Sequence, residues 1–223
     1  WDTGIGKTHL AMILACLLIE DGNLDRVLVV AEVNKVLDWV ADFEKFTKLE
    51  VAAIVPSMTK KRRDALLADP PQVLVGSYET IRNTVAVKGD TKRSDWKPSP
   101  FTQSLAGERV LVVYDECTRL RTRDTSLYRG HECMVKTLRK GCPTGVRVLG
   151  LTATPVERDP EQTFNFGRIV RTPSEMGTVA EFAENHVITY DLFGKPIKFK
   201  NIGQEDHIDP EVQTLRSRLR PMV

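Results

Sequence analysis

The first residues that could do chemistry stand at the start of the chain, where glycines precede a lysine and a threonine. The segment Thr3-Gly4-Ile5-Gly6-Lys7-Thr8 leads at once into an apolar run that continues to Ile19. Glycines let the backbone curl so that successive N–H groups point at one anion, and the N-terminus of the following helix adds the positive end of its dipole. Lys7 would reach the β- and γ-phosphates, and the Thr8 hydroxyl would bind the bridging Mg²⁺. The segment predicts a loop for a Mg²⁺-bound triphosphate; the alternative is a glycine-rich helix entry with a solvated lysine.

Two adjacent carboxylates form the second candidate. Asp115 and Glu116 directly follow the run Val110 to Tyr114, which is apolar at almost every position. Open α/β sheets bind their ligands at the carboxyl ends of the strands. One carboxylate can hold Mg²⁺ while its neighbour orients or deprotonates the attacking water. We therefore assign Asp115 to the metal and Glu116, with Lys7, to catalysis, whereas an acidic pair taken alone is more often a helix cap or a solvated turn.

Short β-branched runs alternate with helical patterns along most of the chain. Runs that are apolar at every position are typical of strands buried on both faces of a parallel sheet. The expected strands are Val27 to Val30, Val51 to Val55, Val73 to Val75, Val110 to Tyr114 and Val146 to Leu151. The expected helices between them are Lys7 to Ile19, Lys35 to Phe46, Lys60 to Leu67, Tyr78 to Val85 and Asp124 to Lys140. This order predicts an α/β, doubly wound domain with a mostly parallel sheet and helices on both faces.

Two stretches break the alternation. The polar stretch from Lys88 to Gly107 predicts an irregular surface excursion. After Pro160 the pattern predicts a mainly helical extension, with a possible hairpin around residues 193–196. The candidate helices there are Glu161 to Ile169, Thr178 to Val187 and Pro210 to Leu219.

Composition bounds the class of protein. With 223 residues, 41% hydrophobic and 28% charged, the chain can bury a sizeable core, which excludes disorder and fibrous repeats. The net charge is +2, so any nucleic-acid binding must come from a local patch. The longest apolar run, Leu10 to Ile19, is shorter than the roughly 18 residues that span a bilayer. The four cysteines have neither metal-site nor disulfide-scaffold spacing. We expect a cytoplasmic, nucleoid or nuclear protein that is neither secreted nor bound to a membrane.

Five stretches follow one another along the chain: Asp2 to Thr8, Val27 to Phe46, Val75 to Arg82, Asp115 to Thr118 and Leu151 to Pro155. In this order they resemble motifs I, Ia and Ib, the DEAH box and motif III of the first RecA-like domain of a superfamily 2 helicase. The resemblance is strongest to the Swi/Snf-type DNA translocases. It implies a RecA-like P-loop fold and an enzyme that hydrolyses ATP with Mg²⁺.

The resemblance also assigns residues to roles. It implies that ATP is bound by Thr3, Gly4, Ile5, Gly6, Lys7, Thr8 and Asp115, with Thr8 and Asp115 holding Mg²⁺. Thr152 and Thr154 would couple the nucleotide site to the DNA cleft. The partner would be DNA, mostly duplex and without sequence preference, because motifs Ia and Ib hold phosphates. The residues expected to contact the DNA backbone are Asn34, Lys35, Ser77, Tyr78 and Arg82.

By the same resemblance, residues 1–158 form an ATP-binding domain that lacks its first strand. Residues 159–223 would lead toward a second RecA-like domain in the same full-length chain. That domain would supply an arginine finger, whose loss costs about 10³ to 10⁵ in rate at comparable sites. We therefore expect little or no turnover from the present chain alone.

Two features favour alternatives. Thr118 stands where the family has a histidine that helps to couple the nucleotide site to motif III. The first alternative is therefore a non-catalytic module that binds ATP or DNA. The second alternative is a restriction or repair helicase of superfamily 2, because these helicases share the motif III form Leu151-Thr152-Ala153-Thr154-Pro155.

Overall fold

The structure, a computed structural model, describes residues 6–89, 95–153, 160–171, 173–190, 192, 194 and 196–199. The chain divides into two compact units. The first unit consists of residues 1–117 and 123–153, and the second of residues 118–122 and 154–223. The boundary expected at residue 158 stays a prediction.

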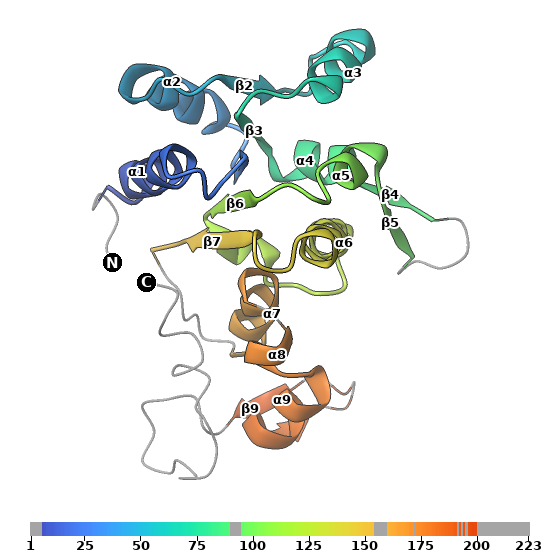
Figure 1. The fold of residues 1–223 in the computed structure, drawn as a ribbon. Helices are drawn as coiled ribbons and strands as arrows, with labels where there is room; N and C mark the ends of the chain where they lie inside the picture. Colours follow the sequence, from blue (N-terminus) through green and yellow to red (C-terminus); the bar gives the residue numbers. More distant parts are fainter. Residues whose placement is uncertain are drawn as a thin grey trace. The chain divides into compact units, whose positions relative to one another are not determined.

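A five-stranded parallel sheet forms the centre of the first unit, in the order β2-β3-β1-β6-β7 (Figure 1). The strands are β1 (Arg26–Ala31), β2 (Val51–Ile54), β3 (Val73–Ser77), β6 (Val110–Asp115) and β7 (Arg147–Leu151). The helices are α1 (Lys7–Glu20), α2 (Val36–Phe46), α3 (Lys60–Ala68), α4 (Tyr78–Val85), α5 (Pro100–Ser104) and α6 (Ser126–Gly141). Each strand and helix expected in this unit is confirmed, with ends that differ by one or two residues.

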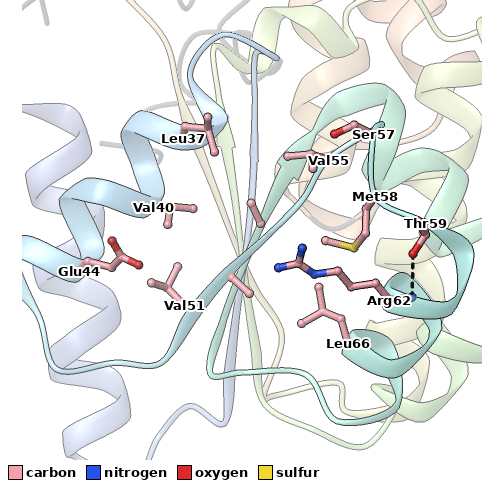
Figure 2. A pocket seen from close by; sticks show the side chains of 12 residues that line it. Leu37, Val40, Glu44, Val51, Val55, Ser57, Met58, Thr59, Arg62 and Leu66 are labelled. Atoms are coloured by element: carbon pink, nitrogen blue, oxygen red, sulfur yellow. Dashed lines mark hydrogen bonds between the residues drawn. The ribbon is translucent and has the colours of Figure 1, made fainter.

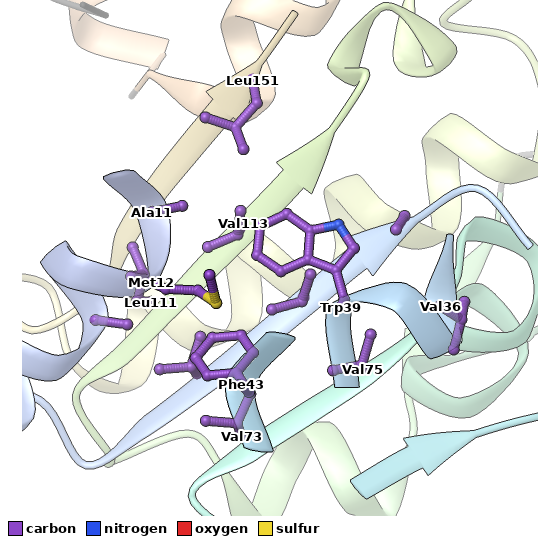
Figure 3. Packing of buried hydrophobic residues seen from close by; sticks show 14 of the residues in the cluster. Ala11, Met12, Val36, Trp39, Phe43, Val73, Val75, Leu111, Val113 and Leu151 are labelled. Atoms are coloured by element: carbon purple, nitrogen blue, oxygen red, sulfur yellow. The ribbon is translucent and has the colours of Figure 1, made fainter. Parts of the chain in front are cut away.

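The main core lies between the sheet and the helices α1 and α2. Met12 from α1 and Trp39 and Phe43 from α2 pack against one face of β1, β3 and β6, where Val29, Val75 and Val113 contribute alternate side chains (Figure 3). The opposite face is covered by α4 and α6, and Tyr78 of α4 stacks on Tyr114 of β6 with ring centroids 6.1 Å apart. The predicted burial of the sheet on both faces is therefore confirmed.

The prediction of an irregular excursion from Lys88 to Gly107 was wrong for the part that the structure describes; residues 90–94 lie outside it. β4 (Ala86–Lys88) and β5 (Trp96–Pro98) pair antiparallel, and α5 follows. The reason is local: Ser99 caps α5 by accepting a hydrogen bond from the Thr102 N–H, and Pro100 occupies the first turn, where its missing N–H costs nothing. Phe101 and Leu105 are buried and fix this segment to the core.

Among its described residues, the second unit is mostly helical. Its elements are α7 (Pro160–Val170), α8 (Pro173–Met176), α9 (Val179–His186), β8 (Val187–Tyr190) and β9 (Pro196–Phe199), with the 3₁₀ turn Cys117–Leu120 at its border. Phe164 stacks on Phe182 with centroids 4.3 Å apart, and a capping box of Thr178 and Glu181 begins α9. The antiparallel pairing of β8 with β9 confirms the expected hairpin. The expected helix at 210–219 lies outside the described residues.

None of the described helices combines the length and the apolar character that crossing a bilayer requires.

Candidate nucleotide-binding site

The start of α1 has the backbone that a phosphate loop needs. Gly6 precedes the helix with φ of 74°, a left-handed conformation that glycine adopts without strain. Lys7 and Thr8 begin the helix and are half-buried. No side chain of the described residues caps this end, and its first turn carries no acidic residue. The positive end of the helix is therefore suited to an anion. Thr3, Gly4 and Ile5 lie outside the described residues.

The acidic pair lies at the carboxyl edge of the sheet, as expected from its position after an apolar run. Asp115 is the last residue of β6 and is opposite Leu151 of β7. Glu116 has φ of 53°, and a non-glycine residue in this region costs of order 1–3 kcal/mol. This turn sends the Glu116 side chain toward the end of β7, where the Thr152 hydroxyl donates a hydrogen bond to Glu116 Oε2 (3.3 Å). Thr154, the other expected coupling residue, lies outside the described residues.

The Asp115 carboxylate has a partner that sequence reasoning missed. The indole Nε1–H of Trp39 donates a hydrogen bond to Asp115 Oδ2 (3.0 Å). Trp39 is only 2% exposed, and its ring packs among core residues with the nitrogen at the core's edge (Figure 3). Trp39 lies in α2 and belongs to the core, and its N–H also orients a carboxylate 76 residues away in the sequence.

A buried aromatic group holds the backbone of the acidic pair. The Tyr78 hydroxyl lies 2.8 Å from the Asp115 carbonyl oxygen and 3.2 Å from that of Glu116 and donates to them. His131 Nε2 lies 3.0 Å from the Tyr78 carbonyl oxygen, which can only accept, so Nε2 carries the proton. Nδ1 then accepts from the Tyr114 hydroxyl at 3.3 Å. Burial lowers the pKa of His131 to about 4, so the ring is neutral at neutral pH.

Both ring nitrogens of His131 are engaged, one by the Tyr78 carbonyl oxygen and one by the Tyr114 hydroxyl, so this histidine has a structural role in the core. Within the described part of the chain, no cluster of three or more His, Cys, Asp and Glu residues could hold a metal ion. Cys117, next to the acidic pair, is buried; burial and then the Glu116 charge raise the pKa of its thiol to about 12, so it remains a protonated core residue.

The expected DNA contacts divide into exposed and buried residues. Asn34 and Lys35 are exposed between β1 and α2, and Lys35 Nζ pairs with Asp38 Oδ2 at 3.0 Å, which raises the pKa of Lys35. A phosphate contact by the side chains of Ser77 and Tyr78 conflicts with their burial. Ser77 caps α4 by accepting from the Thr80 N–H, and the Tyr78 hydroxyl serves the acidic pair.

Arg82, the last of the expected DNA contacts, is half-buried. Its Nη2 donates to Asn83 Oδ1 (2.7 Å), and its guanidinium carbon lies 6.0 Å from the Trp96 ring centroid. Its aliphatic stem lies so close to Gly130 of α6 that a Cβ there would be 2.5 Å from Arg82 Cγ. Arg82 therefore packs α4 against α6 and the β4–β5 hairpin, and its contact with DNA stays a prediction.

A parallel sheet with a glycine-led helix N-terminus, and an acidic pair ending an inner strand, define a P-loop nucleotide-binding domain. The family model of the DEAD/DEAH box helicases matches residues 1–163 of this chain. The chain belongs to the DEAD/DEAH box helicase family. Among curated proteins it is similar to the transcriptional regulator ATRX homolog of Caenorhabditis elegans, at 27% identity over 213 residues that cover 82% of this chain and 15% of the relative.

Two solved structures have a similar fold. The SWI2/SNF2 ATPase core of Sulfolobus solfataricus in complex with dsDNA has a TM-score of 0.58 at 18% identity, covering 82% of this chain and 33% of that one. The Hef helicase domain of Pyrococcus furiosus has a TM-score of 0.55 at 21% identity, covering 76% of this chain and 31% of that one. The chain thus spans a third or less of each of these relatives. The expected RecA-like fold and the resemblance to Swi/Snf-type helicases are confirmed.

Proposed function

We propose that this chain is the ATP-binding domain of a DNA-dependent ATPase of the Swi/Snf type, which hydrolyses ATP with Mg²⁺ to move along duplex DNA. Membership in the helicase family supports ATP hydrolysis. The observation that carries the proposal is the pair Asp115 and Glu116, whose carboxylates have different partners, Trp39 and Thr152. Carboxylates in different surroundings suit different tasks, one at the metal and one at the attacking water.

Oxygen ligands are what Mg²⁺ prefers, and the Thr8 hydroxyl and the Asp115 carboxylate provide them. Mg²⁺ held by these two residues would supply positive charge against the charge that develops on the phosphates. Lys7 and the first N–H groups of α1 would bind the phosphates. Glu116 would orient the water for in-line attack on the γ-phosphate, and Thr152 would sense through Glu116 whether that phosphate is present.

The substitution Glu116→Gln tests this assignment in the full-length protein, since the present chain spans only part of its relatives. We expect unchanged ATP affinity in calorimetry and at least about a hundred-fold loss of hydrolysis rate, because an amide is a poor base for water. Glu50→Gln, at an exposed glutamate, is the matched control and should hydrolyse normally. A Glu116→Gln enzyme with a normal rate would remove the assignment and favour a non-catalytic module.

For DNA we infer backbone contacts from the exposed residues Asn34 and Lys35, together with backbone N–H groups at the start of α4. Helix N-termini bind phosphate through the backbone, which does not require the Ser77 and Tyr78 side chains to be exposed. A second RecA-like domain in the full-length protein would complete the ATP site. The similarity to a transcriptional regulator supports a nuclear location.

A further inference from the structure

A groove on the first unit is lined by none of the residues assigned to ATP, to coupling or to DNA, although one of its walls, α2, belongs to the stretch that resembles motif Ia. It encloses about 510 Å³ along the edge strand β2. Figure 2 shows β2 running between α2 on one side and the segment that leads into α3 on the other. The lining is mainly apolar and includes Leu37, Val40, Val55, Met58, Leu66 and the side chain of Arg62. The groove therefore has a strand as its floor and helices as its walls.

The floor of the groove has open backbone groups. β2 is the first strand in the sheet and, among the described residues, pairs only with β3. The Glu50 carbonyl oxygen accepts a hydrogen bond from the Val73 N–H at 2.9 Å, so the backbone groups of Glu50 face β3. In a parallel sheet successive residues of a strand direct their N–H and C=O groups to opposite sides. The N–H and C=O groups of Val51 and Ala53 therefore face away from β3. No other described residue hydrogen-bonds these groups. Such an edge is a template for a further strand.

One wall begins with a cluster of positive charges. α3 begins with Lys60, Lys61, Arg62 and Arg63, and its first turn has no acidic residue. Cations are unfavourable at the positive end of a helix, so this turn is less stable than a neutral one. The Arg62 guanidinium points over β2 (Figure 2) and forms no ion pair with an acid in the described ranges. A carboxylate in the groove would offset both effects.

We propose that this groove binds an extended segment of a partner protein, which adds a strand to β2 and places an acidic side chain against Arg62. The backbone groups of Val51 and Ala53 would supply affinity, and the apolar walls would take alternate side chains of the segment. DNA fits the groove less well, because phosphate gains nothing from apolar walls.

A labelled peptide tests the proposal on the 223-residue chain. The probe is a fluorescein-tagged heptapeptide that alternates valine with glutamate and threonine, and its counterpart has lysine in place of each glutamate. Fluorescence anisotropy should show saturable binding of the acidic peptide only. Arg62→Glu should weaken it roughly ten-fold, the effect of losing one hydrogen bond between charged groups. Lys61→Glu is the matched control, because it makes the same charge change at a residue outside the groove lining. It should change the affinity for the acidic peptide less than about three-fold.

A second variant separates strand addition from simple charge attraction. Ala53→Pro removes an N–H that faces the open edge, and proline is tolerated at that side of an edge strand. We expect a similar thermal midpoint and loss of at least about five-fold in peptide affinity, from one missing hydrogen bond. Equal binding of both peptides, or affinity unaffected by Arg62→Glu and Ala53→Pro, would overturn the proposal. Arg62-dependent binding of duplex DNA with no peptide binding would instead assign the basic turn to DNA.

Discussion

Asp115 and Glu116 are neighbours in the sequence but are held by different parts of the fold. α2 supplies Trp39 to the first carboxylate, and the residue after β7 supplies Thr152 to the second. The left-handed turn at Glu116 separates the two side chains, and the Tyr78 hydroxyl fixes the carbonyl groups on either side of that turn. A strained residue persists only where its surroundings hold it, so these contacts keep the two carboxylates in different surroundings.

Trp39→Phe is expected to disturb the metal role of Asp115 more than the ATP site as a whole. The substitution keeps an aromatic ring in the core and removes only the N–H donor, and a hydrogen bond to a charged group contributes about 1.5–3 kcal/mol. In the full-length ATPase the Mg²⁺ concentration for half-maximal hydrolysis should rise roughly ten-fold, with ATP affinity nearly unchanged.

Phe43→Leu is the control for this prediction, because Phe43 packs beside Trp39 without contacting the acidic pair. It should lower the thermal midpoint and leave the Mg²⁺ dependence intact. Identical Mg²⁺ dependence in Trp39→Phe and the unmodified protein would show that the indole serves packing alone.

Lys7→Ala should abolish detectable nucleotide binding. A lysine at the first position of α1 adds a full positive charge where the helix already presents its N–H groups, and its removal leaves only the backbone to hold a triphosphate. Isothermal calorimetry with ATP and Mg²⁺ measures this directly. Lys35→Ala, at an exposed lysine in the loop before α2, should retain full affinity; unchanged binding by Lys7→Ala would refute the phosphate role.

At the scale of elements, local patterns were sufficient wherever one property repeats along a segment. Apolar runs such as Val27 to Val30 had to be buried on both faces, so strands, helices and their order could be predicted. The polar stretch from Lys88 to Gly107 has too few apolar residues to give a period, and its signal was the Ser99-Pro100 helix start instead. The place of Asp115, Glu116 and Thr152 in the fold could be predicted, because the carboxyl ends of parallel strands lie at one edge of the sheet.

The contacts within the site were not predictable, because they join residues that only packing brings together. The spacing of Trp39 in its helix predicts a buried ring but not which atom its N–H will meet. Ser77 and Tyr78 had the right place for phosphate contacts, yet helix capping and the acidic pair use their side chains. Tertiary contacts therefore decided the roles that motif order left open.

The packing of α4 against α6 predicts a specific pH dependence of stability. The pKa of His131 falls from 6.5 to about 4 on burial, so between these values the unfolded chain binds a proton that the folded chain does not. Acid therefore favours unfolding, and the free energy of unfolding should rise with pH from about 4 to 6.5 and level off above. At pH 5 the loss from this residue is about 2 kcal/mol.

Urea unfolding at pH 5 and pH 7 measures this effect, with His131→Gln as the comparison. The glutamine can still donate to the Tyr78 carbonyl oxygen but does not titrate, so the variant should lose less stability between the two pH values. Equal losses in both proteins would mean that His131 does not govern the acid sensitivity of this helix pair.

At the scale of the whole molecule, the parallel sheet brings the carboxyl ends of its strands to one edge. At or just after the ends of β1, β3, β6 and β7 lie residues that the helicase resemblance assigns to DNA, to ATP or to coupling, namely Asn34, Ser77, Asp115 and Thr152. Adjacent strands in register, such as Asp115 opposite Leu151, let a change at Glu116 reach Thr152 directly. With the roles proposed for Glu116 and Thr152, coupling between ATP and DNA would need no long path through the domain.

The net charge of the chain is only +2, so binding to DNA must depend on a few local cations. We expect the affinity of the full-length protein for a duplex oligonucleotide to fall steeply with salt and not to depend on sequence. Lys35→Ala should reduce the slope of log affinity against log salt by about one, the effect of one phosphate contact.

Ser77→Ala is the control for this prediction. It should lower the free energy of unfolding by about 1 kcal/mol through the lost helix cap and leave the salt slope unchanged. Anisotropy titrations over a range of salt concentrations measure both slopes. A flat response would exclude backbone binding at this edge, and a reduced slope in Ser77→Ala would restore the hydroxyl contact that burial argues against.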